Sequence, residues 1–284
     1  MKVISSKRCW EYRAYGHPES PERVRRTYEY LTQKGFEIIE PVECKESDIL
    51  LVHSKALLEE VKSENFYEPD TPAIKGIYNY ALLSAGGAIL SSEEAIKGEP
   101  SFSLMRPPGH HVTRTQLGGF CYFNNIAIAV RHLLHRKSIN SVAILDIDCH
   151  HGNGTQDIFL GEDKVLFVSL HQVPLYPGTG LVSEKNCLNF PLPPGTGEKK
   201  YLDTLEKAIK EIQKFKPEIL AISAGFDTYK DDPITDIKLE KISYKKIAEM
   251  ISALKIPVFA VLEGGYSPDL PECIYNFLLG FKTI

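Results

Sequence analysis

The sequence predicts an α/β protein: a single domain in which a mostly parallel β-sheet is sandwiched between helices. Two observations lead to this prediction. Short apolar runs, of the length of buried strands, alternate along the chain with longer stretches of helical periodicity, as in βαβ units. In addition, no linker, repeat or low-complexity segment interrupts the 284 residues, so we expect one domain over residues 1–284 rather than two smaller ones.

The first half of the chain supplies the first strands and helices of this pattern. Ser20, Pro21 and Glu22 combine a cap residue, a proline in the first turn and an early acid, which predicts a helix that runs to Lys34. The other predicted elements are strands at 1–6 and 102–105 and helices at 54–62, 74–96 and 124–136.

The second half contains the most apolar strands. One begins at Val142 and leads into Asp146 and Asp148, which share a face if the strand extends that far, because alternate strand residues point the same way. The other predicted elements are strands at 165–170, 219–223 and 258–262, helices at 198–215, 239–254 and 271–281, and loops rich in proline and glycine at 174–180 and 191–197.

The composition argues against several classes of function. A formal charge of −4 is unfavourable for broad electrostatic binding of nucleic acid or of an anionic membrane surface. No apolar run reaches the ~18 residues of a membrane span, and Lys7 and Arg8 come too early for a signal peptide. The cysteines are scattered without a Cys-x-x-Cys pair, which favours reduced thiols and a cytoplasmic location. They are Cys9, Cys44, Cys121, Cys149, Cys187 and Cys273.

Clusters of polar side chains follow five of the predicted strands. They begin after Met105, Leu145, Leu170, Ser223 and Leu262. Ligand sites of open α/β sheets lie beyond the carboxyl ends of the strands. We therefore expect the five clusters to form one site.

The densest cluster has the side chains of a metal site. Asp146, Asp148 and His150 offer two carboxylates and an imidazole, which suit a divalent metal of intermediate softness such as zinc or iron(II). The alternative for these residues is a buried strand whose aspartates cap a following helix. Asp227 would complete a set of two Asp and one His with positions open for water and substrate, as in catalytic metal sites. Taken alone, Asp227 is equally compatible with a helix cap.

Three further features become candidates for catalysis or substrate binding if a metal is bound nearby. His110 and His111 become a candidate acid/base pair, although alone they would be a detail of a loop. Tyr266 follows two glycines and could donate its hydroxyl to a developing oxyanion, although a buried tyrosine is usually part of the core. The segments 118–120 and 176–178 place an aromatic beside glycine, which suits either the walls of a narrow apolar channel or turns packed on the core.

Six motifs occur in order along the chain: Arg106-Pro107-Pro108-Gly109-His110-His111, Gly118-Gly119-Phe120-Cys121, the run from Asp146 to Thr155, Ser169-Leu170-His171, Ala224-Gly225-Phe226-Asp227 and Glu263-Gly264-Gly265-Tyr266. Together they resemble the histone deacetylase family, and within it the class II-type and bacterial or archaeal deacetylase-like branch, with the arginase/deacetylase fold. The resemblance extends over nearly the whole chain.

This resemblance implies a role for each matching residue. Zinc would be bound by Asp148, His150 and Asp227. The paired histidines would be His110, backed by Asp146, and His111, backed by Asn153, with Tyr266 as the oxyanion donor. The acyl-lysine channel would be lined by Gly119, Phe120 and Tyr176, with Asp70 holding the substrate backbone and Arg23 lining a cavity behind the metal. A structural potassium ion would lie near Asp146, Asp148, His150, Ser169 and Leu170.

Two positions depart from the pattern that the resemblance implies. Tyr176 replaces the phenylalanine that is commoner at that wall, which puts a hydroxyl near the mouth of the channel. Ile234 stands near the position at which polyamine-selective relatives carry an acidic gatekeeper, and this weakens the prediction of a polyamine substrate.

The expected function is that of a zinc-dependent amidohydrolase, with iron(II) as the alternative metal, that removes acetyl or another short acyl group from an amine. The favoured substrate is an acylated lysine in a peptide or protein. The alternatives are a deacylase of acetylpolyamines or other small amines and a non-catalytic module that binds metal or acyl-lysine. A ureohydrolase would need further Asp and His ligands for two manganese ions, which the sequence lacks. We expect neither nucleic acid nor a membrane as a partner, and the sequence leaves the oligomeric state open.

Overall fold

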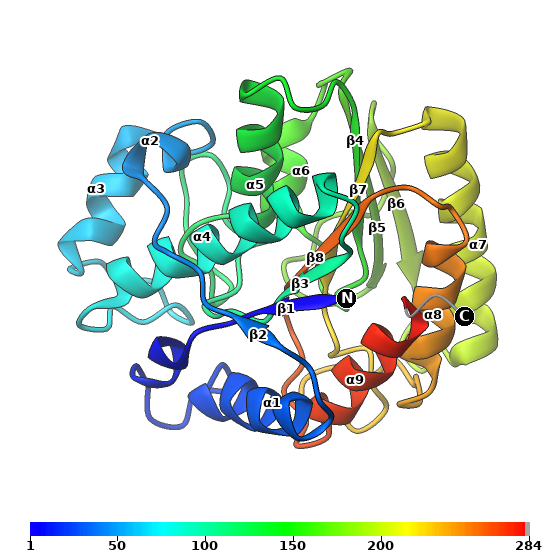
Figure 1. The fold of residues 1–284 in the computed structure, drawn as a ribbon, viewed down its shortest axis with the longest axis horizontal. Coiled ribbons are helices and arrows are strands. Elements are labelled where there is room, and N and C mark those ends of the chain that lie inside the picture. Colours follow the sequence, from blue (N-terminus) through cyan, green and yellow to red (C-terminus); the bar gives the residue numbers. More distant parts are fainter. Residues whose placement is uncertain (282–284) are drawn as a thin grey trace.

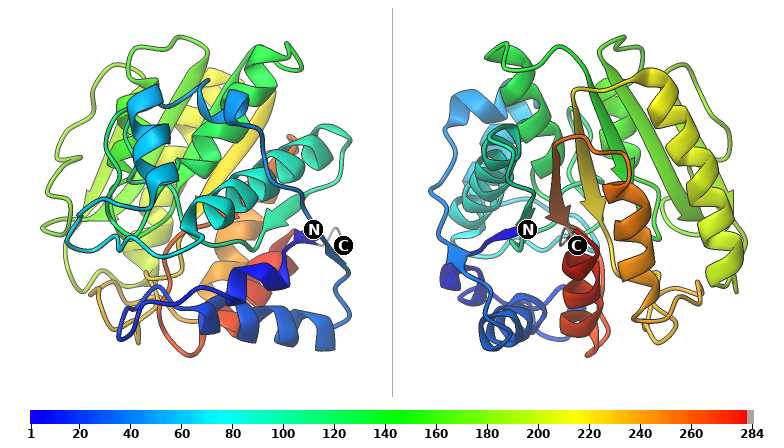
Figure 2. Two further views of the ribbon diagram at one scale, coloured as in Figure 1. Left: turned by 90° about the vertical axis from the view of Figure 1, so that its left-hand side faces the viewer. Right: turned by 45° about the vertical axis from the view of Figure 1, so that its right-hand side comes forward.

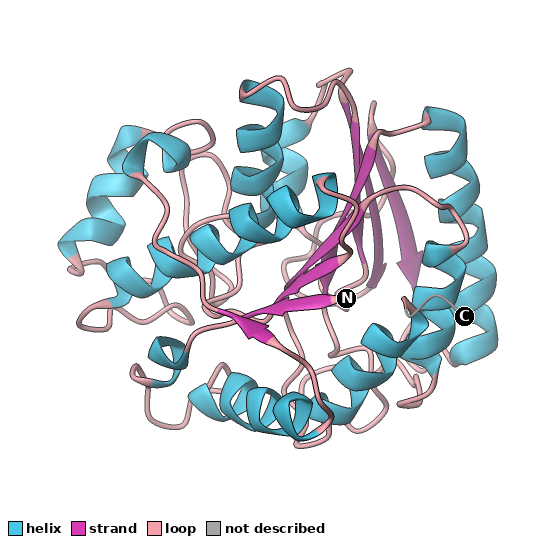
Figure 3. Ribbon diagram, in the orientation of Figure 1, coloured by secondary structure: helices cyan, strands magenta, loops and turns pink. Residues whose placement is uncertain are grey.

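The computed structural model describes residues 1–281, and its centre is one sheet of eight parallel strands (Figures 1 and 3). The strands lie in the order β2-β1-β3-β8-β7-β4-β5-β6. Their bounds are β1 Lys2–Ile4, β2 Ile38–Ile39, β3 Ser101–Ser103, β4 Val142–Asp146, β5 Val165–Gln172, β6 Cys187–Leu192, β7 Ile219–Ala224 and β8 Val258–Leu262. The predicted α/β fold with a parallel sheet is confirmed. The prediction of one domain stays a prediction, and its last three residues lie outside the described ones.

Helices cover both faces of the sheet (Figure 2). Helices α1, α7, α8 and α9 pack on one face, and α2, α3, α5, α6 and most of α4 pack on the other. Their bounds, with those of the 3-10 helix η1, are η1 Lys7–Trp10, α1 Pro21–Gln33, α2 Glu46–Ile49, α3 Lys55–Ser63, α4 Ile77–Ile96, α5 Asn125–His135, α6 Asn153–Phe159, α7 Glu198–Phe215, α8 Ser243–Ser252 and α9 Leu270–Gly280.

The central strands separate two apolar cores. In β4, Ala143 and Leu145 belong to one buried cluster and Val142 and Ile144 to the other, because successive strand residues point to opposite faces. All four are fully buried. Burial on both faces explains why this strand is a continuous apolar run in the sequence instead of an alternating one.

One helix cap connects the fold to the site. The side chain of Asn124 accepts a hydrogen bond from the Ala127 backbone N–H at 3.1 Å and so caps α5. Its amide donates to the backbone carbonyl of Val112 at 3.1 Å. The start of α5 is thereby tied to the segment that carries His110 and His111.

The elements differ from the predicted ones mainly at their ends. The β4 strand ends at Asp146, so Asp148 lies beyond it. Helix α8 begins at Ser243, four residues later than predicted, because Leu239 pairs with Tyr229 in an isolated β-bridge. The sequence analysis also missed η1, α2, α6, β2 and β6. All are short, and β6 contains Pro191, which is tolerated because β6 is an edge strand.

Among residues 1–281, no helix is both long enough and apolar enough to cross a membrane. The sheet order brings the carboxyl ends of β3, β8, β7, β4 and β5 side by side. The segments that follow these five strands all contribute to one cavity, which is described next.

Candidate metal centre and active site

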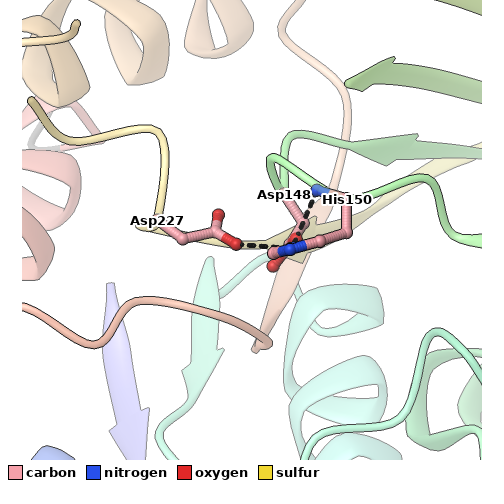
Figure 4. Close-up of side chains that lie close together, drawn as sticks. All are labelled: Asp148, His150 and Asp227. Atoms are coloured by element: carbon pink, nitrogen blue, oxygen red, sulfur yellow. Dashed lines mark hydrogen bonds and ion pairs between the residues drawn. The ribbon is translucent and has the colours of Figure 1, made fainter. Parts of the chain in front are cut away.

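The centre of the site is a buried group of two aspartates and a histidine (Figure 4). Potential ligand atoms of Asp148, His150 and Asp227 all lie within 4.8 Å of one another. Nδ1 of His150 lies 2.8 Å from Oδ2 of Asp227 and 3.1 Å from Oδ1 of Asp148. Asp148 and His150 follow β4, and Asp227 follows the neighbouring strand β7, so the sheet itself brings the three together.

Backbone groups hold the two carboxylates in place. Oδ1 of Asp227 accepts a hydrogen bond from the Cys149 N–H at 2.8 Å, and Oδ2 of Asp148 accepts one from the Gly264 N–H at 2.7 Å. A Cβ atom at Gly264 would lie 2.6 Å from Oδ2 of both aspartates. Only glycine therefore allows this close approach of the β8–α9 segment.

The charges of this group call for a cation. Burial and repulsion from Asp148 raise the pKa of Asp227 to about 7. Burial opposes ionisation of Asp148 as well, but His110 and His150 lower its pKa below the usual range. For His150, burial is outweighed by hydrogen bonds to Asp148 and Asp227, which raise its pKa to about 10. The two carboxylates thus share one imidazole as a hydrogen-bond partner. Potential nitrogen and oxygen ligands lie within 4.8 Å of one another, which fits a divalent metal such as zinc.

The two adjacent histidines have different partners. Nδ1 of His110 lies 2.9 Å from Oδ2 of Asp146, and Nδ1 of His111 lies 2.8 Å from Oδ1 of Asn153. Burial would lower the pKa of His110, but the carboxylates of Asp146 and Asp148 raise it to about 10. Burial, then repulsion from His110 and His150, lowers the pKa of His111 well below its ordinary value. One imidazole therefore keeps its proton near neutrality while the other is free to accept one.

A cavity of about 260 Å³ leads to this group. Its walls include Phe120, whose ring centroid lies 5.8 Å from that of Tyr266, and Tyr176, whose ring centroid lies 5.1 Å from that of His111. Gly119 has a positive φ of 60°, and a Cβ there would lie 2.4 Å from the His111 ring. Oδ1 of Asp70 accepts a hydrogen bond from the Gly119 N–H at 3.1 Å. The structure thus brings the four residues predicted for the substrate channel to one cavity.

Tyr266 lies in the same cavity wall, after the β8 strand. Burial raises the pKa of its hydroxyl well above 10, so the phenol keeps its proton. The Arg23 guanidinium lies 4.7 Å from the centre of its ring. Nε of Arg23 donates to the Gly265 carbonyl at 2.6 Å, and Arg23 and Tyr266 also line a second cavity.

The predicted potassium site stays a prediction. Asp146 and Ser169 are aligned partners in the β4–β5 ladder, and Oδ1 of Asp146 accepts from the Asp148 N–H at 3.0 Å. The hydroxyl of Ser169 lies 2.9 Å from Nδ1 of His171. These contacts bring together three of the five residues that the resemblance named, namely Asp146, Asp148 and Ser169.

The sequence analysis gave no role to Glu263, although it belongs to a quoted motif. The side chain is fully buried, and its Oε2 accepts hydrogen bonds from the N–H groups of Gly109 at 2.8 Å and His110 at 3.2 Å. Burial raises its pKa to about 7. Its position directly after a strand, before two glycines, was the available signal. Asp232 was missed as well: it accepts from the Tyr266 N–H at 2.7 Å.

Comparison with known proteins assigns the chain to a family. The model for the histone deacetylase domain matches residues 17–279. A probable deacetylase of Archaeoglobus fulgidus is 40% identical over 278 residues, which cover 89% of this chain and 77% of that protein. The structure of the HDA15 HD domain superposes with a TM-score of 0.92 at 28% identity, covering 98% of this chain and 90% of that one. An acetylpolyamine aminohydrolase from Burkholderia pseudomallei gives 0.88 at 28% identity, covering 99% and 98%.

Fold, buried centre and relatives together define a hydrolytic deacetylase, an enzyme of the amidohydrolase type. The chain belongs to the histone deacetylase family, as its motifs predicted.

Proposed function

We propose that this protein is a zinc-dependent amidohydrolase that removes acetyl or another short acyl group from an amine, with an acylated lysine side chain as the favoured substrate. One observation supports this proposal above the others. The Asp148–His150–Asp227 group lies at a narrow cavity that also contains His110, His111 and Tyr266. The group suits zinc, with iron(II) as the alternative metal.

The proposed chemistry divides among the side chains around that group. When bound, the metal would polarise the amide carbonyl and lower the pKa of a water molecule. His111, whose pKa is low, accepts the proton of the attacking water and passes it to the leaving amine. His110, paired with Asp146 at 2.9 Å, contributes orientation and positive charge. Tyr266 donates its hydroxyl to the oxyanion.

The cavity supports a long, slender substrate. Phe120 and Tyr176 present ring surfaces to it, and the aliphatic stem of an acylated lysine fits between such walls. Asp70 offers a carboxylate in the same cavity and would hold the substrate backbone. Acylated polyamines or other small amines are the second candidate class, and the similarity to an acetylpolyamine aminohydrolase favours them. Ile234 in the wall argues against them, because an apolar side chain cannot pair with a second ammonium group.

The decisive experiment combines metal analysis with turnover. The purified protein is reconstituted with zinc or with iron(II) and assayed on acetyl-lysine peptides, longer acyl-lysine peptides and acetylated polyamines. We expect one metal per chain and the highest kcat/KM on an acyl-lysine peptide. A preference for acetylpolyamines would select the second candidate. Full metal binding without turnover on any of these substrates would instead indicate a non-catalytic binding module.

The cellular setting is proposed from the thiols. All six cysteines are free in the structure. Scattered, unpaired thiols are typical of a reducing compartment, and this supports a cytoplasmic location.

A further inference from the structure

The segment that carries Tyr266 is held at each of its four residues, 263–266. Its anchors come from different parts of the chain, and Arg23 bonds two residues of the segment, because its Nη2 also donates to the Glu263 carbonyl. They are Ala224 O to Glu263 N at 3.0 Å, Asp148 Oδ2 to Gly264 N at 2.7 Å, Arg23 Nε to Gly265 O at 2.6 Å and Asp232 Oδ2 to Tyr266 N at 2.7 Å. Asp232 is therefore the anchor bonded to Tyr266 itself.

The anchor at Tyr266 matters because glycines precede it. Gly265 has φ +119°, a conformation that residues with a side chain rarely adopt. A chain with this freedom does not by itself fix the direction of the next residue. Phe120 and Arg23 contact the Tyr266 ring, but these contacts involve the side chain and not the backbone. Two hydrogen bonds fix the peptide group between Gly265 and Tyr266: Arg23 donates to its carbonyl oxygen, and Asp232 accepts from its N–H.

Asp232 bonds a second residue of the same cavity. Its Oδ1 accepts a hydrogen bond from the Ile234 N–H at 3.1 Å, while Oδ2 is bonded to Tyr266. Ile234 and Tyr266 both line the cavity, although they follow different strands, β7 and β8. A single carboxylate thus connects the wall of the channel to the tyrosine.

The surroundings of this carboxylate are unusual for a structural aspartate. Asp232 is 7% exposed and makes no ion pair with any residue in 1–281. Burying a carboxylate without a direct ion pair is costly, and the cost is offset in part by hydrogen bonds to the charged form, with a smaller contribution from the charge of Arg23. Here those bonds go to Tyr266 and Ile234.

We propose that Asp232 is a positioning residue of the deacetylase site: its two oxygens hold the backbone of Tyr266 and that of the wall residue Ile234 at the cavity, and so fix their positions relative to one another. This inference rests on the oxyanion role proposed for Tyr266. It adds that the Asp232 carboxylate fixes the positions of both Tyr266 and the channel wall.

The test is a double-mutant cycle on zinc-loaded enzyme. Asp232→Asn keeps the side-chain volume but leaves one acceptor oxygen for two N–H groups, so one of the two bonds is lost. We expect kcat to fall between about ten-fold and a hundred-fold, as misplacement of a reacting group by about 1 Å does. In a Tyr266→Phe background, the same change should lower kcat by less than about two-fold, because the hydroxyl that it positions is already gone.

Two further variants separate positioning from general damage. Asp231→Asn alters the exposed neighbouring carboxylate and should keep the activity of the unmodified enzyme. Asp232→Glu keeps the charge and both acceptors but is one methylene longer, so it should displace Tyr266 and lower kcat at full zinc content. It replaces Asp232→Asn in the cycle if that variant does not fold.

The outcomes distinguish this inference from the proposal on which it rests. If the loss of kcat is equally large with and without the Tyr266 hydroxyl, or if both Asp232 variants keep full activity, Asp232 does not position Tyr266. If Tyr266→Phe alone keeps nearly full activity, the oxyanion role of Tyr266 fails, and this inference fails with it.

Discussion

Two buried groups of charged side chains lie near Tyr266, and they differ in how their carboxylates are paired. The first, the arginine cluster, consists of Glu19, Arg23 and Arg106. The second, the metal-site cluster, contains four carboxylates and two imidazoles that can carry positive charge. Its members are Asp146, Asp148, Asp227, Glu263, His110 and His150.

The single carboxylate of the arginine cluster is paired with both arginines of the cluster. Nε and Nη2 of Arg106 both bond the Glu19 carboxylate at 2.7 Å, and Nη1 of Arg23 lies 3.2 Å from Glu19 Oε1. The remaining Arg106 donor reaches the backbone carbonyls of Cys9 at 2.6 Å and Tyr12 at 3.0 Å. Burial alone would raise the pKa of Glu19, but the two arginines lower it to about 2.

In the metal-site cluster, Asp148 resembles Glu19 in its lowered pKa, but two other carboxylates show the opposite shift. Burial and like charge raise the pKa of Asp227 to about 7, and burial raises that of Glu263 to about 7. A buried carboxylate that resists ionisation lacks a sufficient positive partner. The comparison indicates that the carboxylate of the arginine cluster is fully paired within the folded chain, whereas the metal-site cluster has carboxylates available to bind a cation.

Removing a metal ligand should have the largest effect. Asp227→Ala leaves Asp148 and His150 as a two-ligand site, so zinc affinity should fall steeply. Loss of Lewis-acid stabilisation worth several kcal/mol corresponds to a drop in kcat of roughly a thousand-fold or more. Metal content and turnover of the purified variant check this. Asp231→Ala, which removes an exposed acid from the same loop, is the control. Stoichiometric zinc with near-normal activity would refute the assignment of Asp227.

Breaking the arginine cluster should instead damage the fold. Glu19→Gln leaves Arg106 and Arg23 buried without a carboxylate, and removing one partner of a buried ion pair typically costs about 3 to 5 kcal/mol. We expect the free energy of unfolding to fall by that amount, while the folded fraction still binds one zinc per chain. Urea denaturation and metal analysis measure the two quantities separately. A variant of unchanged stability would show that the cluster is not a structural unit.

The tyrosine near the two clusters should affect the rate and not the fold. Tyr266→Phe removes one hydroxyl and keeps the ring between Arg23 and Phe120. Loss of one oxyanion donor typically costs ~2.7 to 4 kcal/mol of transition-state stabilisation. A fall in kcat of roughly a hundred-fold or more, with a smaller change in KM and full zinc content, is the expected result. A fall of less than about five-fold would move the oxyanion role to another group.

The metal-site cluster could be predicted from the sequence to a large extent. Asp148, His150 and Asp227 each follow an apolar strand, and parallel strands bring such positions to one edge. The contacts of His110 with Asp146 and of His111 with Asn153 were implied by the family resemblance. Both are present in the structure, at 2.9 and 2.8 Å. Local motifs and strand order carry this information.

The arginine cluster and the hydrogen bonds of Asp232 and Glu263 could not be predicted in this way. Glu19 and Arg106 are 87 residues apart, and Glu263 bonds backbone groups 153 and 154 residues away. Such contacts depend on the exact paths of loops and produce no periodic pattern. From the sequence alone, an acidic residue in a loop cannot be distinguished from a solvated surface charge, because only the fold shows which buried donor lies beside it.

The smallest expected effect is a pH dependence of the arginine cluster. The pKa of Glu19 is about 2 in the folded protein, below the value of 4.5 for an ordinary glutamate. Its contribution to stability is therefore fully present above pH 4.5 and is lost as the pH falls towards 2. By pH 3.5 roughly 1.4 kcal/mol of that contribution should be gone. The stability difference between the unmodified protein and Glu19→Gln, measured by urea denaturation at pH 7 and at pH 3.5, should shrink by this amount. Because both proteins share every other titrating group, the difference isolates Glu19. A gap that stays constant with pH would mean that the arginines do not lower the pKa of Glu19, and the contrast between the two clusters would then rest on geometry alone.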